Sequence, residues 1–212
     1  MWCAATGRPG RENWPGHEKN PSLNWIRPPG PVAPGLRIGL LGGSFDPAHG
    51  GHLHVSLTAM KRLRLDYVWW LVSPGNPLKQ APAPLAERLA GARAIARHPR
   101  LIVSDIEGQL GTRYTIDTVK ALQRRFPFVH FVWLMGSDNL ENFHHWRNWQ
   151  EIARRLPLAV VQRPGSLLAR NNAAPIRRFG TRDALRPPPA ILVLDGARNF
   201  ESATRLRRLG PP

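Results

Sequence analysis

A glycine-rich segment with two histidines is the strongest candidate for chemistry in this sequence. It spans residues 42–52 and reads GGSFDPAHGGH. Gly42 and Gly43 leave room for a phosphate group to approach backbone N–H groups. His49 and His52 lie three positions apart, so they share a face on the first turn of a helix. Imidazoles titrate near neutral pH and donate hydrogen bonds to phosphate oxygens, so the segment predicts a site for a phosphate-bearing ligand.

This segment differs from two commoner phosphate-binding motifs. The sequence contains no G-x-x-x-x-G-K-[ST], which argues against a P-loop NTPase, and no G-x-G-x-x-G, which leaves a dinucleotide-binding dehydrogenase without support. An apolar run precedes the segment and a helical pattern follows it. A turn of this kind lies at the carboxyl edge of an open α/β sheet, where ligands bind.

The elements that must position this turn alternate between strand and helix. Apolar and β-branched runs predict strands at residues 36–41, 67–72, 101–104, 128–134, 158–161 and 190–194. Helical periodicity predicts helices at residues 52–65, 85–97, 115–126 and 146–155. Repeated strand–helix units imply right-handed crossovers and a parallel sheet. We therefore expect an α/β fold, a doubly wound, Rossmann-like parallel sheet with helices on both faces.

The two ends of the chain are less regular. Closely spaced prolines and glycines in residues 1–35 leave no helical or strand period. We interpret residues 1–35 as a disordered or loosely attached tail, and residues 36–212 as the folded domain. The Pro- and Arg-rich interval 164–189 is expected to be loop, and residues 202–208 resemble the start of a helix.

Composition limits the class of protein. The 212 residues are 42% hydrophobic, which is enough for one core, and the single cysteine excludes a disulfide framework. No apolar run approaches the roughly 20 residues of a membrane helix, and no signal peptide is visible. We expect a cytoplasmic protein that does not enter the membrane. The net charge of +16 is spread along the chain, which fits a solvated surface or a positive field over phosphate-bearing ligands.

The motifs together resemble the H-x-G-H nucleotidyltransferase superfamily and, within it, the bacterial nicotinate-nucleotide adenylyltransferases. The H-x-G-H element is residues 49–52. Further matches follow in the order of that family: SPGNPLK at 73–79, SDIE at 104–107, GTRYTIDT at 111–118, GSDNL at 136–140, HW at 145–146, RPG at 163–165 and ESATRLR at 201–207. The resemblance covers about residues 36–208. Glu201 and Ala203 depart from the family pattern, which has an apolar residue and a serine there.

The resemblance implies a reaction. ATP and nicotinate mononucleotide give deamido-NAD and pyrophosphate, as the 5′-phosphate of the mononucleotide attacks the α-phosphorus of ATP in line. Such a reaction depends on positioning and charge stabilisation more than on covalent chemistry. The family uses Mg²⁺, which is expected on the triphosphate, so that the protein supplies no dedicated metal ligands.

The resemblance also implies the residues of the ATP site. His49 and His52 are the expected catalytic residues, with His52 stabilising the charge at the α-phosphate. The expected ATP contacts are Gly43, Ser44, Phe45, His49, His52, Ser202, Thr204 and Arg207. The first three would act through their backbone, and the last three would hold the β- and γ-phosphates.

The expected residues for the pyridine nucleotide come from the middle motifs. Trp146 would stack on the nicotinate ring, unless it is a core residue. Tyr114 and Thr115 would contact the nicotinate end. Asn76 and Lys79 are candidates for its phosphate or carboxylate, and Asp138 either accepts a ribose hydroxyl or caps a helix. We assign three further tryptophans to the core: Trp69, Trp70 and Trp133.

Two alternatives remain open at this point. Pantetheine-phosphate adenylyltransferase belongs to the same superfamily, although the Tyr114-Thr115, Trp146 and Arg163-Pro164-Gly165 set argues against it. The positive charge also permits a basic RNA-binding protein, but nucleic acid is not the partner we expect. The choice between nicotinate and nicotinamide mononucleotide, and the oligomeric state, are not readable from the sequence.

Overall fold

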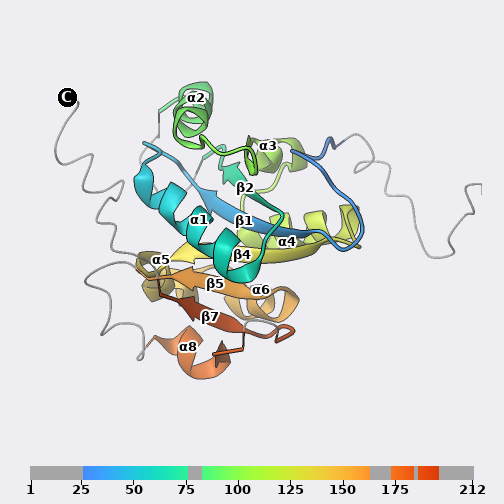
Figure 1. The fold of residues 1–212 in the computed structure, drawn as a ribbon, viewed down its shortest axis with the longest axis vertical. Coiled ribbons are helices and arrows are strands. Elements are labelled where there is room, and N and C mark those ends of the chain that lie inside the picture. Colours follow the sequence, from blue (N-terminus) through green and yellow to red (C-terminus); the bar gives the residue numbers. More distant parts are fainter. Residues whose placement is uncertain (1–25, 76–82, 163–172, 184–185, 196–212) are drawn as a thin grey trace, which may run out of the picture.

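The core of the protein is a parallel sheet of seven strands in the order β3-β2-β1-β4-β5-β7-β6 (Figure 1). The computed structural model describes residues 26–75, 83–162, 173–183 and 186–195. Every neighbouring pair of strands is parallel. The strands are β1 (Arg37–Gly43), β2 (Tyr67–Val72), β3 (Leu101–Ser104), β4 (His130–Gly136), β5 (Leu158–Val161), β6 (Gly180–Thr181) and β7 (Ile191–Leu194).

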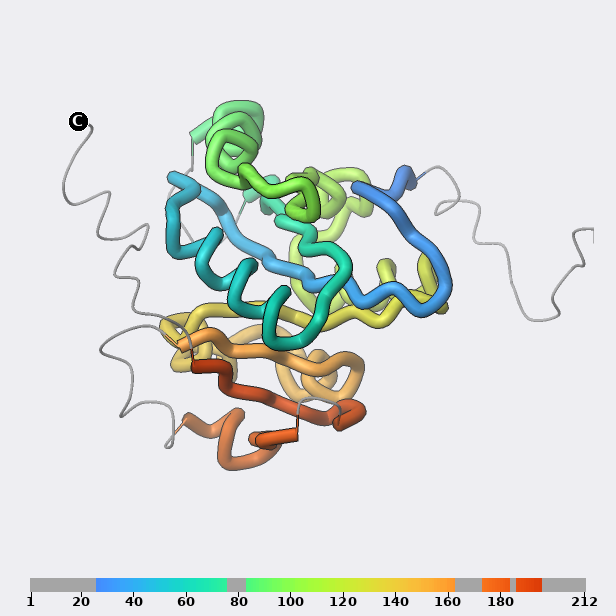
Figure 2. Tube along the Cα trace, in the orientation of Figure 1, coloured from blue at the N-terminus to red at the C-terminus, as the bar shows by residue number. Residues whose placement is uncertain are grey.

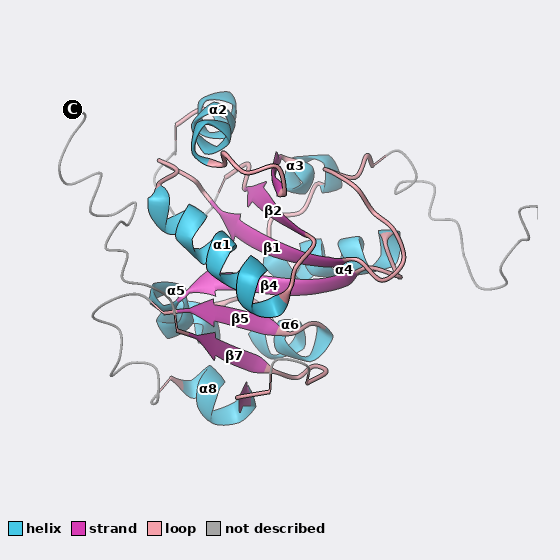
Figure 3. Ribbon diagram, viewed as in Figure 1, coloured by secondary structure: helices cyan, strands magenta, loops and turns pink. Residues whose placement is uncertain are grey.

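Helices cover both faces of the sheet (Figure 3). One face carries α1 (Gly50–Leu63) and α2 (Leu85–Ile95). The other carries α3 (Ile106–Leu110), α4 (Thr115–Arg125), α5 (Ser137–Asn142), η1 (Phe143–His145) and α6 (Trp149–Arg155). The short helix α8 (Ala174–Phe179) lies beside β6 and β7. The expected fold class, a doubly wound parallel sheet, is confirmed.

The strands are apolar because both of their faces are buried. On β2, Trp69 and Leu71 belong to the apolar cluster under α4 and α6, whereas Trp70 belongs to the cluster under α1 and α2. Strands buried on both faces have continuous apolar runs rather than alternating ones. Trp69, Trp70 and Trp133 are at most 1% exposed, which confirms their assignment to the core.

Most element positions agree with the sequence analysis, and a few do not. The strands at 67–72, 101–104 and 158–161 are found with the expected bounds. The interval 164–189 was expected to be loop, and this is wrong for α8 and β6. The expected helix at 146–155 is also shorter, because η1 precedes it and α6 begins at Trp149. The helices α3 and α5 are too short to show a helical period in the sequence.

The described end of the N-terminal segment packs on the domain. Ile26 is 2% exposed and lies in the cluster under α4 and α6. The backbone of Gly30 passes so close to the side chain of Ile102 that a Cβ there would collide with it. The N–H of Gly35 donates to the carbonyl of Phe128 at 2.9 Å. Figure 2 follows this stretch, in blue, around the outside of the domain before it enters β1.

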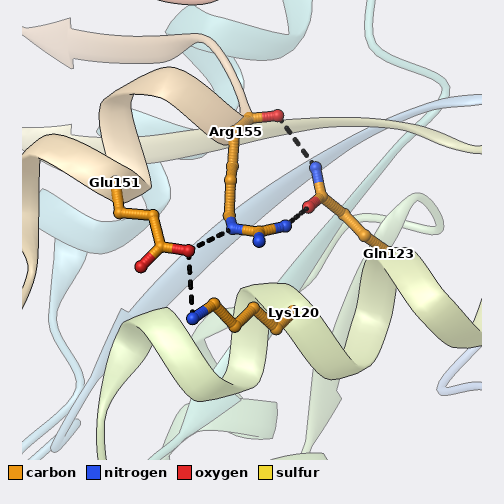
Figure 4. Close-up of polar contacts among 4 residues, drawn as sticks. All are labelled: Lys120, Gln123, Glu151 and Arg155. Atoms are coloured by element: carbon orange, nitrogen blue, oxygen red, sulfur yellow. Dashed lines mark hydrogen bonds and ion pairs between the residues drawn. The ribbon is translucent and has the colours of Figure 1, made fainter.

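Helices α4 and α6 are also joined by a polar network on the surface (Figure 4). Glu151 Oε1 lies 3.0 Å from Lys120 Nζ and 3.0 Å from Arg155 Nε. Gln123 donates to the Arg155 carbonyl at 2.8 Å and accepts from the Arg155 guanidinium at 3.3 Å.

In the part of the chain that the structure describes, no helix combines the length and apolar character needed to span a membrane.

Candidate active site

The candidate site lies at the carboxyl edge of the sheet, where β1 gives way to the glycine-rich turn. Strand β1 has β2 on one side and β4 on the other. The chain crosses to one side of β1 for β2 and β3, and to the other side for β4 and β5. A parallel sheet opens a crevice at such a switch point, and ligands bind there. Strands β1, β2 and β4 all end at this edge (Figure 1).

The two histidines begin α1 and cap it reciprocally. His49 is the N-cap, and its Nδ1 accepts from the N–H of Gly51 at 3.0 Å. The Nδ1 of His52 accepts from the N–H of His49 at 3.3 Å. A ring nitrogen that accepts from a backbone N–H carries no proton itself, so each neutral imidazole carries its proton on Nε2. The capping therefore fixes both rings and makes Nε2 a donor on each of them.

The rings of the two histidines lie against each other and on an aromatic base. Their centroids are 3.9 Å apart, and His49 is only 4% exposed. The Phe45 ring lies 4.5 Å from the His52 ring and stacks on Trp70 at 5.1 Å. Phe45 has φ +49°, a left-handed conformation that is uncommon for a side chain of this size. With this backbone turn the ring is only 1% exposed.

The two glycines that end β1 have different roles. A Cβ on Gly42 would lie 2.8 Å from the Trp133 ring, so Gly42 is needed for packing inside the protein. A Cβ on Gly43 would meet only the Phe45 ring, at an ordinary 3.5 Å. Close approach of a ligand therefore remains a reason for glycine at position 43, whereas the packing of Trp133 is the reason at position 42.

A buried arginine that the sequence analysis did not select joins the first two loops. Arg88 on α2 is 4% exposed, and its guanidinium donates to the carbonyls of Ser44, Ser73, Pro74 and Ala83. A signal for it was present in the sequence. Arg88 falls at helical spacing between Leu85 and Ala92, so it lies on the apolar face of its helix.

The turn between α3 and α4 is held by a buried carboxyl and two threonines. The hydroxyl of Thr118 contacts Oε1 of Glu107 at 3.2 Å and the hydroxyl of Thr112 at 2.8 Å. The N–H of Thr112 donates to the carbonyl of Glu107 at 3.0 Å. Burial raises the pKa of Glu107 to about 7, although the Thr118 hydrogen bond opposes the shift. This network fixes the backbone that leads to Tyr114 and Thr115.

Tyr114, Arg147 and Trp146 come together at the same edge. The guanidinium of Arg147 lies over the Tyr114 ring, 4.6 Å from its centroid. Trp146 is half-buried and meets the rings of Phe143 and Trp133 edge-on, at 5.4 and 6.2 Å. Trp146 is therefore anchored by the core but not enclosed in it.

Two further expected residues begin helices at this edge. Helix α4 starts at Thr115, and the side chain of its N-cap Tyr114 makes no capping bond. Asp138 lies exposed in the first turn of α5, whose N-cap is Gly136. Its role, contact with a ribose hydroxyl or capping of the helix, stays a prediction.

Several expected residues lie outside the described part of the chain: Asn76, Lys79, Ser202, Thr204 and Arg207. Their roles stay predictions. Among the residues that the structure describes, no three His, Cys, Asp or Glu side chains gather as a metal site would require.

A cavity of about 580 Å³ opens at the opposite edge of the sheet. Arg37, His130 and Leu158, which begin β1, β4 and β5, line it. Open α/β sheets bind ligands at the carboxyl ends of their strands, so we do not assign the reaction to this cavity.

Comparisons with known proteins identify the family. Residues 40–209 match the family described as Cytidylyltransferase-like. The chain is 53% identical over 180 residues to a Cereibacter sphaeroides protein named "Probable nicotinate-nucleotide adenylyltransferase", covering 82% of this chain and 97% of the relative. A protein of the same name from Methylorubrum extorquens is 52% identical over 183 residues, covering 81% and 99%.

One solved structure shares the fold at low sequence identity. It is the Plasmodium falciparum nicotinic acid mononucleotide adenylyltransferase complexed with NaAD. It matches with a TM-score of 0.62 and 15% identity, over 82% of this chain and 83% of that one. At this identity the likeness supports the architecture of the sheet and its helices.

Proposed function

Because the chain belongs to the nicotinate-nucleotide adenylyltransferases, a family of cytidylyltransferase-like proteins, we propose that it transfers the adenylyl group of ATP to nicotinate mononucleotide. The products are deamido-NAD, the dinucleotide of NAD biosynthesis, and pyrophosphate. The observation that carries the proposal is the pair of imidazoles that cap α1 beside the glycine turn, at the switch point of the sheet.

The ATP end of the site would work by charge stabilisation. An oxygen of the 5′-phosphate of the mononucleotide forms a bond to the α-phosphorus, and the bond to the β-phosphate bridging oxygen breaks. The Nε2–H groups of His49 and His52, with the N-terminus of α1, would donate to the phosphate oxygens as negative charge shifts onto them. Ser202, Thr204 and Arg207 are proposed to hold the β- and γ-phosphates.

Mg²⁺ fits this arrangement as a partner of ATP. The described residues offer imidazole and backbone N–H donors at the turn and no cluster of carboxylates. A hard cation prefers oxygen ligands, so we propose that phosphate oxygens hold it. When bound, it would neutralise part of the triphosphate charge.

The pyridine end of the site would select a carboxylate. The N-terminus of α4, whose first turn also carries Asp117, and the guanidinium of Arg147 lie beside Tyr114. The helix end and Arg147 would favour a nicotinate carboxylate over a neutral amide. Trp146 supplies a flat, anchored ring for the pyridine, and Asn76, Lys79 and Asp138 remain proposed contacts.

We place the activity in the cytoplasm as part of the same proposal, because ATP and the ribotide are metabolites of that compartment.

An acceptor panel tests the proposal. The purified chain is mixed with ATP, Mg²⁺ and one of three acceptors: nicotinate mononucleotide, nicotinamide mononucleotide or phosphopantetheine. Pyrophosphate release is followed, and the product is identified by its mass. We expect deamido-NAD with the first acceptor and at least about tenfold lower kcat/KM with the amide, because the site loses a charge pair. Turnover with phosphopantetheine alone, or with none of the three, contradicts the proposal.

A further inference from the structure

Arg88 links two loops that belong to different halves of the candidate site. The Nε–H of its guanidinium donates to the carbonyl of Ala83 at 2.7 Å. One terminal nitrogen donates to the carbonyls of Ser44 and Ser73 at 2.8 and 2.7 Å, and the other donates to the carbonyl of Pro74 at 3.1 Å. Ser44 follows β1 and Ser73 follows β2. One side chain therefore holds the ends of both strands.

The partners of Arg88 are unusual for a buried cation. A buried guanidinium is ordinarily paired with a carboxylate, but the four hydrogen bonds that Arg88 makes with described residues all go to backbone carbonyls. Hydrogen bonds from a charged donor are stronger than neutral ones. The planar fork of arginine also fixes the directions of its donors, which a lysine ammonium cannot reproduce. The group is therefore suited to hold backbone segments at a set distance.

The two loops lead to different substrates under the proposed function. Ser44 lies between Gly43 and Phe45 in the turn assigned to ATP. Ser73 and Pro74 begin the motif that continues to Asn76 and Lys79, which are assigned to the ribotide. The strand ladder joins the loops at their base, where the N–H of Ser73 donates to the carbonyl of Gly43 at 2.9 Å. Arg88 is a second contact that the two loops share.

We propose that Arg88 is a positioning residue that sets the ATP turn and the ribotide loop relative to one another, without touching either substrate. The inference rests on the proposed function, because that function assigns the two loops to two reactants. In-line attack depends on the alignment of the two reacting groups, and a misplacement of about 1 Å can cost about 100-fold in rate. Loss of Arg88 should therefore lower kcat more than it weakens the binding of either substrate alone.

The test compares R88K and R88A with the control R93A, an exposed arginine on the same helix. For each variant, kcat is measured with both substrates, and Kd is measured separately for nicotinate mononucleotide and for a non-hydrolysable ATP analogue. We expect kcat to fall about 100-fold in R88A and less in R88K, while each Kd changes less than about threefold. Guanidinium chloride below denaturing concentration should restore part of kcat in R88A, and potassium chloride should not.

Hydrogen exchange gives a readout that does not require turnover. The backbone amides of residues 44–46 and those of Ser73 and Gly75 should exchange faster in both Arg88 variants than in wild type or R93A. Unchanged exchange in either loop overturns the proposal, as does wild-type kcat in R88A. Equal losses in kcat and in both affinities, without guanidinium rescue, assign Arg88 to folding alone. A wild-type protein that is inactive with every acceptor would contradict the proposed function. The hydrogen-exchange data would still show whether Arg88 holds the two loops together.

Discussion

The polar groups at the carboxyl edge and those between α4 and α6 are bonded to different kinds of partner. In the surface network, Lys120, Glu151 and Arg155 meet each other through side chains that are each about one third exposed, at 36%, 35% and 37%. At the carboxyl edge, Arg88 and His49 are each 4% exposed and are bonded to the backbone of loops and a helix end. Exposed pairs contribute little to stability, whereas buried groups are costly to remove and can hold a loop in place.

The two glutamates show the same contrast in their titration. The hydrogen bond from Lys120, followed by that from Arg155, lowers the pKa of Glu151. Burial raises the pKa of Glu107 to about 7. Glu151 lies where its negative charge is favoured, whereas Glu107 is buried where its negative charge is disfavoured. We infer that the surface network supports the packing of α4 on α6. At the carboxyl edge, buried polar groups fix the geometry of the loops at a cost in stability.

The largest effect is expected at His52. Replacing it in H52A should lower kcat/KM about 1,000-fold, because a donor to the developing phosphate charge is lost. H52Q is the sharper variant. Its amide oxygen can still accept from the N–H of His49, as glutamine does in a capping box, so α1 should begin normally while activity is still lost. Steady-state pyrophosphate release measures both.

The control for His52 is H130A, which removes an exposed imidazole from the other end of the sheet. It should keep wild-type kcat/KM. Activity near wild type in H52Q, with unchanged helix content by circular dichroism, would remove His52 from the reaction.

A smaller effect is expected at Trp146. W146A should raise KM for nicotinate mononucleotide about 10- to 100-fold and leave KM for ATP nearly unchanged, because stacking of a base on an aromatic ring is worth about 1–3 kcal/mol. W146F should lie between the two. Equal increases in both KM values would show that Trp146 acts through the packing of Phe143 and Trp133 instead.

Glu107 gives a prediction that depends on pH. Because burial raises the pKa of Glu107 from its ordinary 4.5 to about 7 in the folded protein, the folded protein holds the proton more tightly between these two pH values. The free energy of unfolding therefore falls as pH rises from about 4.5 to about 7. Above pH 7 the full cost of burying the ionised Glu107 carboxylate is reached, and the free energy of unfolding falls no further on its account. E107Q should be more stable than wild type by about 1–3 kcal/mol at pH 8, at about 1.4 kcal/mol per pKa unit, and nearly equal to it at pH 5.

Denaturant unfolding at the two pH values measures this difference. A gain from E107Q that is equal at pH 5 and pH 8 would mean that the carboxyl does not titrate in this window. The control T118V removes the hydroxyl that contacts Glu107 and should make the high-pH penalty larger.

The smallest effect is expected in the surface network. E151Q removes the charge that Lys120 and Arg155 share, so it should lose a little stability above the ordinary pKa of a glutamate and none in acid, where Glu151 is protonated in both states. Its kcat and KM should match wild type. A loss of activity in E151Q would break the contrast between the two regions, and thermal unfolding together with the pyrophosphate assay would detect it.

The sequence was sufficient where a local pattern determines structure. The strand at 67–72 is apolar because it is buried on both faces. His49 and His52 lie three positions apart at the start of a helical pattern, so their proximity at the beginning of α1 could be predicted. Arg88 and the Glu107–Thr118 contact depend on segments that the topology brings together, up to 44 residues apart in the chain. No local period reports such contacts. The packing role of Gly42 could not be predicted for the same reason, since the ring that needs its space belongs to Trp133 on another strand.

The central claim is that the imidazoles of His49 and His52 hold the phosphates of ATP. The most direct measurement is ¹⁵N NMR of histidine side chains during titration with a non-hydrolysable ATP analogue, with signals assigned through H49Q and H52Q. The account predicts protons on Nε2 of both rings before titration, and saturable shifts of these two Nε2 signals while those of His98 and His130 stay in place. Analogue binding that leaves the His49 and His52 signals unmoved would contradict it.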